Sequence, residues 1–407
     1  MRKVYLDHCA TTPLDKRALA AMMPYLTESY GNASSVHLFG QQARAAADKA
    51  RRQVASLISA RANEIVFTSG GTEANNLAIR GICESVAPHG RHLITSAIEH
   101  PSVRGPIEEF EKKGWEVTRL PVYEDGTVRV EDVREAIRPG TVLVSVMLAN
   151  NEIGTIQPVA AIGALVRAAG QKHLRFHVDA VQAAGRVPID IEALGCDLLT
   201  LSAHKIYGPK GIGGLFIRRG VRIRPQQVGG HQERERRAGT ESVANIVGFG
   251  AACELAKNEM LDRNKHAQCL RDRFEKEVGQ RIGDVVLNGA SDHRLPHVSN
   301  ISFRFIEGEG LLIHLDLQGI AVSTGSACSS GTLEPSPVIR ALGRNEELAR
   351  GAIRFSFGKD NTSEDLDYVL EALPRAVESL RALSPLVRSS EPVSHSHPFS
   401  TRSSGPV

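Results

Sequence analysis

Two residues in separate apolar runs, Asp179 and Lys205, carry the most distinctive chemistry of this sequence. Asp179 lies within Phe176-His-Val-Asp-Ala-Val-Gln182, where a buried carboxylate needs a cationic partner or its pKa rises. Lys205 ends an apolar run and enters a turn that is rich in glycine and proline. A protonated pyridine nitrogen can pair with the aspartate, and the lysine can form a Schiff base with a carbonyl cofactor. The pair predicts a pyridoxal phosphate (PLP) site.

A glycine-rich turn could hold the phosphate of such a cofactor. The segment Ser69-Gly-Gly-Thr-Glu-Ala-Asn-Asn76 follows an expected strand and opens an expected helix. Gly71 lets the backbone approach a ligand, helix N-terminal amides favour anions, and the Thr72 hydroxyl can reach a phosphate oxygen. Taken alone, the segment is an ordinary turn between a strand and a helix. The glycines of 208–214 are not a dinucleotide or P-loop motif, because a strand and not a helix follows them.

Three more polar residues lie at the ends of expected strands or inside them. His100 and Asn151 each follow a strand's carboxyl end, where α/β sheets bind ligands. The imidazole could stack on a cofactor ring and move protons, or it could be structural. The amide could bind a cofactor oxygen or a substrate carboxylate, or it could belong to a plain turn. Arg354 within an apolar strand indicates either a bidentate bond to a carboxylate ligand or an internal ion pair.

Cys328 lies among small residues, in Ser323-Thr-Gly-Ser-Ala-Cys-Ser-Ser-Gly-Thr332. Structural cysteines are usually buried among large apolar side chains, so this one is expected on an exposed, mobile loop. Such a loop can carry a thiolate toward a bound substrate and away again. A reactive cysteine and an inert one are both compatible with the pattern.

The order of elements predicts the fold class. Strand-like and helix-like segments alternate from about residue 40 to 260, which indicates a mostly parallel sheet with helices on both faces. After Val243 one long helix-period stretch runs to about Arg281 and leads to a second domain. We expect a large domain over 15–260, a small domain from 1–14 and 261–384 that carries Cys328, and a disordered tail over 385–407.

Composition narrows the class of protein. The chain has 407 residues and a formal net charge of +3, so two domains are possible and nucleic acid is not an expected partner. Its six cysteines include no Cys-x-x-Cys pair, which argues against a zinc ribbon or a redox dithiol. No apolar run has the length of a signal-peptide core or a membrane span. We expect a cytoplasmic protein with reduced thiols, no membrane contact and no metal site of its own.

Together these segments resemble the cysteine desulfurases, a branch of the class V aminotransferases. The similarity runs from Tyr5 to about Pro385, and the segment around Cys328 resembles that of the iron–sulfur-cluster and nitrogen-fixation group. The resemblance implies the type I fold of PLP enzymes. In this α/β fold a large domain, with a mostly parallel seven-stranded sheet between helices, joins a smaller α+β domain. The matching segments are Ser69–Asn76, Asn150–Gly154, His177–Gln182, Ser202–Gly211, Arg237–Thr240 and Ser326–Ser329.

The resemblance also implies a role for each matching residue. Lys205 would bind the cofactor as a Schiff base and move protons, Asp179 would pair with the pyridinium nitrogen, and Gln182 would bond the phenolic oxygen. His100 would stack on the ring and act in acid–base steps, and Cys328 would attack the sulfur of the substrate. The substrate carboxylate would be bound by Asn151 and Arg354. Thr240 would reach the cofactor from the second subunit of a homodimer. The other implied cofactor ligands are Gly71, Thr72, Asn151, Ser202 and His204.

The activity that the resemblance implies is conversion of L-cysteine to L-alanine with a persulfide on Cys328. Its sulfur would pass to an acceptor protein for iron–sulfur cluster assembly, tRNA thiolation or cofactor synthesis, and Cys328 could ligate a transferred cluster. The alternatives are a selenocysteine lyase, another PLP-dependent lyase or aminotransferase, and a non-catalytic paralogue. Cys328 argues against transamination, which needs no thiol. The intact Lys205, Asp179, His100 and Arg354 argue against a paralogue without activity.

Two segments depart from the family pattern. His8-Cys9 replaces a more usual Asn-Ala pair, which alters packing near the N-terminus or adds a second thiol near the site. The C-terminus is rich in Ser, Pro and His where the family has an ending that docks a cluster scaffold. The sequence therefore leaves the identity of the sulfur acceptor open.

Overall fold

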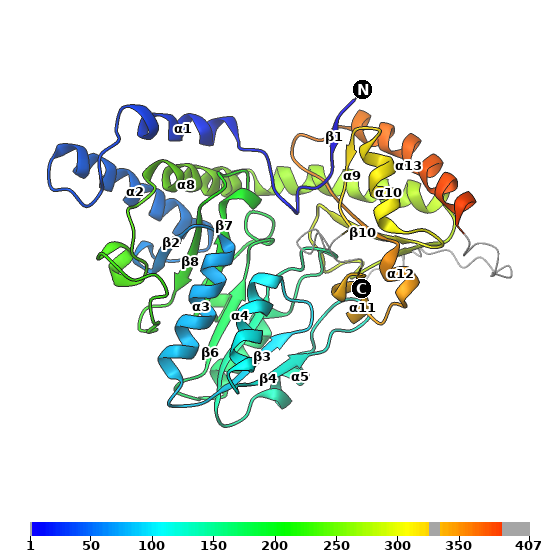
Figure 1. Cartoon of the computed structure of the whole chain (residues 1–407). Helices are drawn as coiled ribbons and strands as arrows, with labels where there is room; N and C mark the ends of the chain where they lie inside the picture. The colour runs from blue at the N-terminus through cyan, green and yellow to red at the C-terminus, as the bar shows by residue number, and fades with distance from the viewer. Residues whose placement is uncertain (1, 325–333, 385–407) are drawn as a thin grey trace, which may run out of the picture.

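The computed structural model describes residues 2–324 and 334–384, and a seven-stranded central sheet dominates it (Figure 1). All neighbouring strands pair in parallel except that β8 runs antiparallel to both β2 and β7. The short turn that contains Lys205 joins β7 to β8, and only antiparallel neighbours can be joined without a long crossover. The strands in spatial order are β2 (Ile65–Thr68), β8 (Gly213–Ile217), β7 (Leu198–Ser202), β6 (Arg175–Asp179), β5 (Thr141–Met147), β3 (His92–Ser96) and β4 (Glu116–Leu120).

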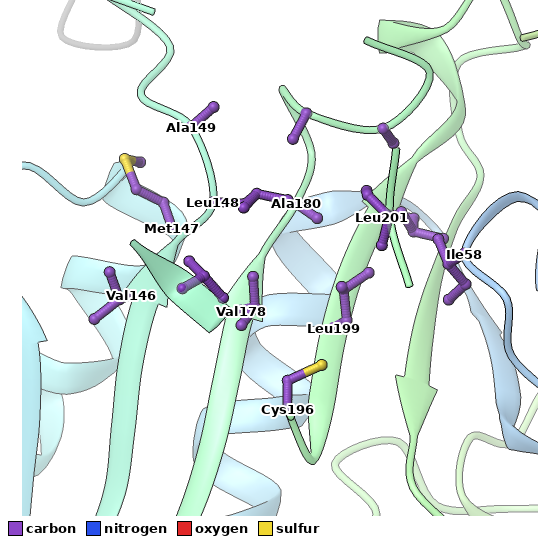
Figure 2. Close-up of a cluster of buried hydrophobic side chains, with 14 of the residues drawn as sticks. Ile58, Val146, Met147, Leu148, Ala149, Val178, Ala180, Cys196, Leu199 and Leu201 are labelled. Carbon is purple, nitrogen blue, oxygen red and sulfur yellow. The ribbon is translucent and has the colours of Figure 1, made fainter. Parts of the chain in front are cut away.

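Apolar side chains alternate between the two faces of this sheet. Leu198 packs with one buried cluster and Leu199 with another, as the two-residue period of a strand requires. One face is covered by α3 (Gly71–Val86) and α4 (Pro101–Lys112), and the other by α2 (Leu38–Leu57), α6 (Val159–Ala168) and α8 (Val243–Asn258). Figure 2 shows part of the cluster that contains Leu199, where side chains of β5, β6 and β7 lie side by side. The predicted mostly parallel sheet with helices on both faces is confirmed.

A second set of elements, called here the C-terminal unit, has its own apolar core. Its antiparallel sheet has the order β12 (Ala352–Ser356), β10 (Val298–Phe303) and β9 (Val285–Leu287). Helices α9 (Met260–Arg281), α10 (Gly308–Asp316) and α13 (Ser363–Leu383) pack against it, around Phe274 and Phe355. The chain's start joins this unit, because β1 (Val4–Tyr5) pairs in parallel with β11 (Ile320–Ala321).

The single long helix expected after Val243 is wrong, because the structure has α8 and α9 with a break at Glu259. Glu259 has a non-helical backbone, with φ −107° and ψ 6°, and its carboxylate pairs with Arg17 and Arg263. The apolar pattern could not show this break, since an ion pair with a distant helix does not change the periodicity.

The remaining elements are short or lack a strong apolar stripe, and the sequence did not reveal most of them. Helix α1 (Lys16–Thr27) leaves Leu19, Met23 and Leu26 exposed, so its pattern does not mark a single buried face. The others are α5 (Val130–Ala136), α7 (Ile191–Leu194), α11 (Pro337–Ala341), α12 (Glu346–Arg350) and the 3₁₀ turns Ala62–Glu64, Ala203–Lys205 and Gln232–Glu235.

Candidate active site

A cavity of about 230 Å³ lies at the carboxyl ends of β5, β6 and β7. This is the edge of an α/β sheet where ligands bind. The cavity contains most of the residues that the sequence analysis singled out. Its lining is formed by Ala10, Gly71, Thr72, His100, Ser102, Met147, Ala149, Asn151, Asp179, Val181, Gln182, Ser202, His204 and Lys205.

Asp179 is held in place at the end of β6. Its Oδ2 accepts a hydrogen bond from Asn75 Nδ2 at 2.7 Å, and its Oδ1 accepts one from the Val181 backbone N–H at 2.9 Å. Asn75 also donates to Ser102 Oγ at 2.8 Å, so α3 fixes the carboxylate and the start of α4 together. Sequence reasoning missed Asn75, although it lies within the glycine-rich motif Ser69–Asn76. The result is a buried, oriented carboxylate that faces the cavity.

Lys205 lies in the 3₁₀ turn after β7, under the N-terminal segment of the chain. Its Nζ donates to the backbone carbonyl of Cys9 and to that of Ala10 at 2.7 Å. Gln182 Nε2 donates to the Cys9 carbonyl as well, at 2.9 Å. Thr12 binds the His204 carbonyl through its backbone N–H and its Oγ1, each at 2.9 Å. The segment from Cys9 to Thr12 therefore forms one wall of the site. The sequence analysis did not predict this contact, because the segment and the Lys205 turn are far apart along the chain.

His100 is the N-cap of α4, and the geometry of the cap fixes its ring. Its Nδ1 accepts from the Ser102 backbone N–H at 3.1 Å and lies 2.8 Å from Ser102 Oγ. Burial lowers the pKa of His100; the negative charge of Asp179 opposes this effect and the positive charge of Lys205 adds to it. The neutral imidazole is thus favoured, and a neutral ring can both stack on an aromatic cofactor and accept a proton.

The N-terminus of α3 and the end of β7 form an anion-binding corner. Gly71 and Thr72 open this 16-residue helix, whose first amides are available to an anion. A Cβ on Gly71 would lie 3.0 Å from Val181 Cγ2, so the close approach favours glycine there. Ser202 Oγ is buried and has no hydrogen-bond partner within the described residues. This donor set fits the phosphate group of PLP.

His204 borders the same corner. Its Nδ1 lies 3.1 Å from Thr11 Oγ1. Burial lowers its pKa to about 4, with further effects from Lys205 and Lys210, so the ring is neutral at ordinary pH. It can therefore offer an N–H to an anion without carrying charge.

Arg354 lies beside the cavity without lining it. Its Nη1 donates to the Asn151 backbone carbonyl at 2.9 Å, and its Nη2 pairs with Asp7 Oδ1 at 2.7 Å. The internal ion pair that the sequence left open is thus present. The buried Nε has no partner in the described part of the chain, so one donor of the guanidinium is still available. Asn151 itself lines the cavity.

One of the expected site residues, Thr240, is exposed and does not line the cavity with the others. Its segment is connected to the site only indirectly, since Arg237 pairs with Glu73 in the first turn of α3 at 2.8 Å. Cys328 lies outside the described residues, so the structure does not test its predicted role.

Glu99, which sequence reasoning passed over, is buried next to the site. Its Oε1 accepts hydrogen bonds from Ser96 Oγ at 2.6 Å and from the Met147 backbone N–H at 2.9 Å. Burial raises the pKa of Glu99 to about 8, and the negative charge of Asp179 contributes in the same direction. The available signal was a charged residue in the short segment that follows a buried strand, which ends at Ser96. A protonated Glu99 ties the turn that precedes His100 to β5.

Replacing Glu99 by glutamine is expected to change how stability depends on pH. Above its ordinary pKa of 4.5 the carboxyl loses its proton on unfolding but keeps it when folded, so wild-type stability falls as the pH rises toward 8. Glu99→Gln cannot titrate and keeps the Oε1 acceptor. From about pH 5 to about pH 8, the free energy of unfolding of this variant should rise by about 3 kcal/mol relative to that of wild type. Urea unfolding at the two pH values measures this, with the exposed Glu371→Gln as control. Parallel pH profiles of wild type and Glu99→Gln would contradict the assignment.

Neither a metal-binding group of side chains nor a membrane-spanning helix occurs in the part of the chain that the structure describes. In residues 2–324 and 334–384, no three His, Cys, Asp or Glu side chains are grouped so that they could hold a metal ion. None of the helices there has both the length and the apolar character needed to cross a bilayer.

Comparisons with known proteins show the family to which this chain belongs. Residues 4–369 match the family model of class-V aminotransferases. A cysteine desulfurase, IscS of Dictyoglomus turgidum, is 50% identical over 384 residues, which are 94% of this chain and 97% of that protein. A solved NifS-like protein has 37% identity and a TM-score of 0.87, over 93% of this chain and all of that one. The solved complex of SspA with cysteine has 33% identity and a TM-score of 0.77, over 88% of this chain and all of SspA. The chain therefore belongs to the class-V aminotransferase family, in its cysteine desulfurase branch.

Proposed function

We propose that this protein is a PLP-dependent cysteine desulfurase that converts L-cysteine to L-alanine and leaves a persulfide on Cys328. The observation that carries the proposal is one cavity in which Asp179, Lys205 and an anion-binding corner meet, in a chain of the desulfurase branch. When bound, PLP supplies an electron sink that weakens bonds at the α and β carbons of an amino acid. We further propose that the sulfur passes to an acceptor protein in the cytoplasm.

The residues that line the cavity would each act on a different part of the cofactor or substrate. Lys205 would hold the cofactor and move protons at the substrate's α carbon. Asp179, fixed by Asn75, would keep the pyridine nitrogen protonated, because a buried carboxylate favours a cation at that position. Ser202, with Gly71, Thr72 and His204, would bind the phosphate, and Gln182 would bind the phenolic oxygen. His100 would pack against the ring.

Substrate binding and sulfur removal need groups at the edge of the cavity. Asn151 and Arg354 bind the substrate carboxylate, and the Nε donor of Arg354 supports this role. Cys328 attacks the sulfur of bound cysteine as a thiolate; the new S–S bond forms while the Cβ–S bond breaks, and its electron pair remains on the β carbon. Protonation there completes alanine, and the enzyme retains the sulfur as a persulfide.

A homodimer is part of the proposal. Apolar side chains with large exposed fractions gather on α1 and the segment after it, and such a patch is typical of a protein interface. Thr240 is exposed on another segment, as a residue that serves the partner's cofactor would be. The patch consists of Leu19, Met23, Leu26, Tyr30, Val36, Leu38 and Phe39.

The domain boundaries are also proposed, with a large domain over 15–260 and a small one from 1–14 and 261–384. The separate apolar core around Phe274 and the break at Glu259 support the boundary after 260.

Replacing Asp179 by asparagine should slow the reaction more than it weakens cofactor binding. The asparagine keeps the shape but cannot favour a protonated ring nitrogen, so kcat/KM for L-cysteine should fall by about 10²–10³-fold. A matched control is Asp197→Asn, because Asp197 Oδ2 also accepts a backbone hydrogen bond, from Phe176 at 2.9 Å, but lies before β7. Equal rates for Asp179→Asn and wild type would remove Asp179 from the mechanism.

The direct test of the proposed activity is product analysis. Purified protein with PLP is mixed with L-cysteine and a reducing thiol, and alanine and sulfide are measured over time. Equal amounts of the two products support a desulfurase. Alanine formed only from L-selenocysteine, with release of selenide, would replace the proposal with a selenocysteine lyase. A keto acid formed in place of alanine would replace it with an aminotransferase.

A further inference from the structure

Tyr207, two positions after Lys205, has a backbone conformation that non-glycine residues rarely adopt. Its φ is +66°, and its side chain is 1% exposed. Such a conformation persists only where the surroundings fix it. Two main-chain hydrogen bonds do so: the Tyr207 N–H donates to Thr12 Oγ1 at 2.8 Å, and its carbonyl accepts from the Asp15 N–H at 2.9 Å.

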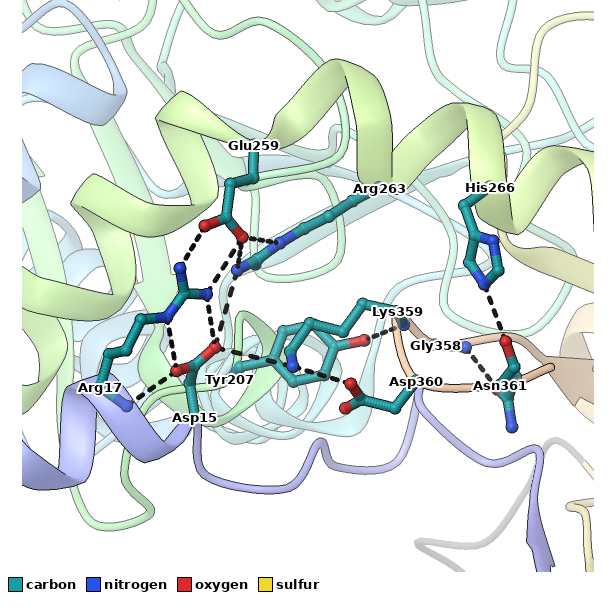
Figure 3. A network of polar contacts seen from close by, with 10 residues as sticks. All are labelled: Asp15, Arg17, Tyr207, Glu259, Arg263, His266, Gly358, Lys359, Asp360 and Asn361. Carbon is teal, nitrogen blue, oxygen red and sulfur yellow. Dashed lines mark hydrogen bonds and ion pairs between the residues drawn. The ribbon is translucent and has the colours of Figure 1, made fainter.

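The side chain of Tyr207 reaches the C-terminal unit. Its Oη accepts a hydrogen bond from the Lys359 backbone N–H at 2.8 Å. Cationic groups surround its ring, with Arg263 and Lys359 at 5.2 Å from the centroid and Arg186 at 5.8 Å. Figure 3 shows the ring between α1, α9 and the loop after β12. Tyr207 therefore contacts both the elements around the central sheet and the C-terminal unit.

Asp15 joins the same groups through charge (Figure 3). Its Oδ2 lies 3.0 Å from Arg17 Nη2, 3.7 Å from Lys359 Nζ and 3.9 Å from Arg263 Nη2. The hydrogen bond from Arg17 holds the pKa of Asp15 well below its ordinary value, so the carboxylate stays charged. Its side chain is only 5% exposed, which reduces screening of these interactions by solvent.

This network connects the turn that holds Lys205 with the strand β12 that carries Arg354. On one side it is anchored at Tyr207, in the turn that positions Lys205. On the other side it ends at Lys359, in the loop that follows β12, and β12 carries Arg354. The strands β7 and β12 belong to different sheets, so no strand pairing fixes one relative to the other. The N-terminal segment also links the two sides, since Asp7 pairs with Arg354 and the carbonyls of Cys9 and Ala10 bind Lys205.

We propose that Tyr207 and Asp15 are positioning residues that set where Arg354 lies relative to Lys205, and so determine the affinity for the substrate carboxylate. This inference rests on the proposed function. Neither residue lines the cavity, so they act through the backbone of the lysine turn and of the loop after β12. Loss of the network should weaken binding of the amino acid without removing the cofactor.

The test uses Asp15→Asn and Tyr207→Phe in the PLP-loaded protein. Asparagine keeps the N-cap of α1 and loses the charge, while phenylalanine keeps the ring and loses Oη. In each variant the Kd of L-alanine, which binds without being desulfurated, and the KM of L-cysteine should rise about ten-fold, with kcat and the visible cofactor spectrum little changed. Hydrogen exchange of the Lys359 amide should accelerate in Tyr207→Phe even without cofactor, because its acceptor is gone.

Matched controls separate positioning from general loss of stability. Asp190→Asn changes another N-cap, that of α7, and Tyr368→Phe removes a phenol that bonds the Gln318 carbonyl within the C-terminal unit. Both should leave the L-alanine Kd unchanged. If the test variants bind L-alanine like these controls, the inference is overturned. If Asp15→Asn does not fold, Tyr207→Phe alone decides. If wild type neither binds L-alanine nor releases sulfide, the proposed function is overturned, and this inference falls with it.

Discussion

Lys205→Ala is expected to abolish the visible absorption of the lysine-bound cofactor and to reduce alanine formation by about 10⁴-fold, the upper range for a positioned acid–base group. The ammonium group is held over the cavity by the carbonyls of Cys9 and Ala10, in reach of a cofactor placed between Asp179 and the corner at Ser202. Alanine removes both the covalent link and the group that moves protons. Absorption spectra and alanine assays measure the two effects separately.

Lys210→Ala is the matched control, because Lys210 is an exposed lysine in the same glycine-rich turn. It should retain the visible band and nearly wild-type activity. A visible band that survives unchanged in Lys205→Ala would show that another residue binds the cofactor, and the assignment of the site would be wrong.

Cys328→Ala is expected to keep the cofactor colour and lose sulfide release. The step needs an accessible thiolate, and the thiols that the structure describes are mostly unsuited to it. Burial raises the pKa of Cys196 to about 12, and it also raises the pKa of Cys83 and of Cys253 well above the usual value, so these thiols stay protonated and inert. Sulfide production should therefore fall to the background of the cofactor-free protein, with the PLP content unchanged.

Cys269→Ala provides the control, since Cys269 is the exposed cysteine among those described. It should release sulfide at the wild-type rate. Sustained sulfide release by Cys328→Ala would remove Cys328 from the mechanism. Cys9 would then be tested next, although it is buried, because its Sγ lies 3.6 Å from His297 Nε2 and its carbonyl contacts the Lys205 side chain.

Local patterns were enough to predict the elements around the cavity. Asp179 was expected within an apolar run, and it ends β6; His100 was expected after a strand, and it caps α4. Parallel strands bring their carboxyl ends to one edge of a sheet, so residues far apart in the sequence meet there without further information. This is why a strand pattern together with a lysine turn could locate the site.

Contacts between distant segments were not predictable in the same way. The wall formed by Cys9 to Thr12, the pair of Arg354 with Asp7 and the break at Glu259 all depend on partners in other elements. A single sequence contains no periodic signal for such pairs. Asn75 was within the quoted motif Ser69–Asn76 and Glu99 directly precedes His100, yet their importance became visible only when Asp179 and Met147 were placed beside them.

A single-turnover experiment tests the central claim most directly. PLP-loaded protein with its thiols reduced is mixed with one equivalent of L-cysteine per chain, without added thiol, and alanine and the mass of the peptide that holds Cys328 are measured. The account predicts one alanine per chain and a gain of one sulfur atom on Cys328. Alanine without added sulfur on that peptide, or an unchanged substrate, would contradict it.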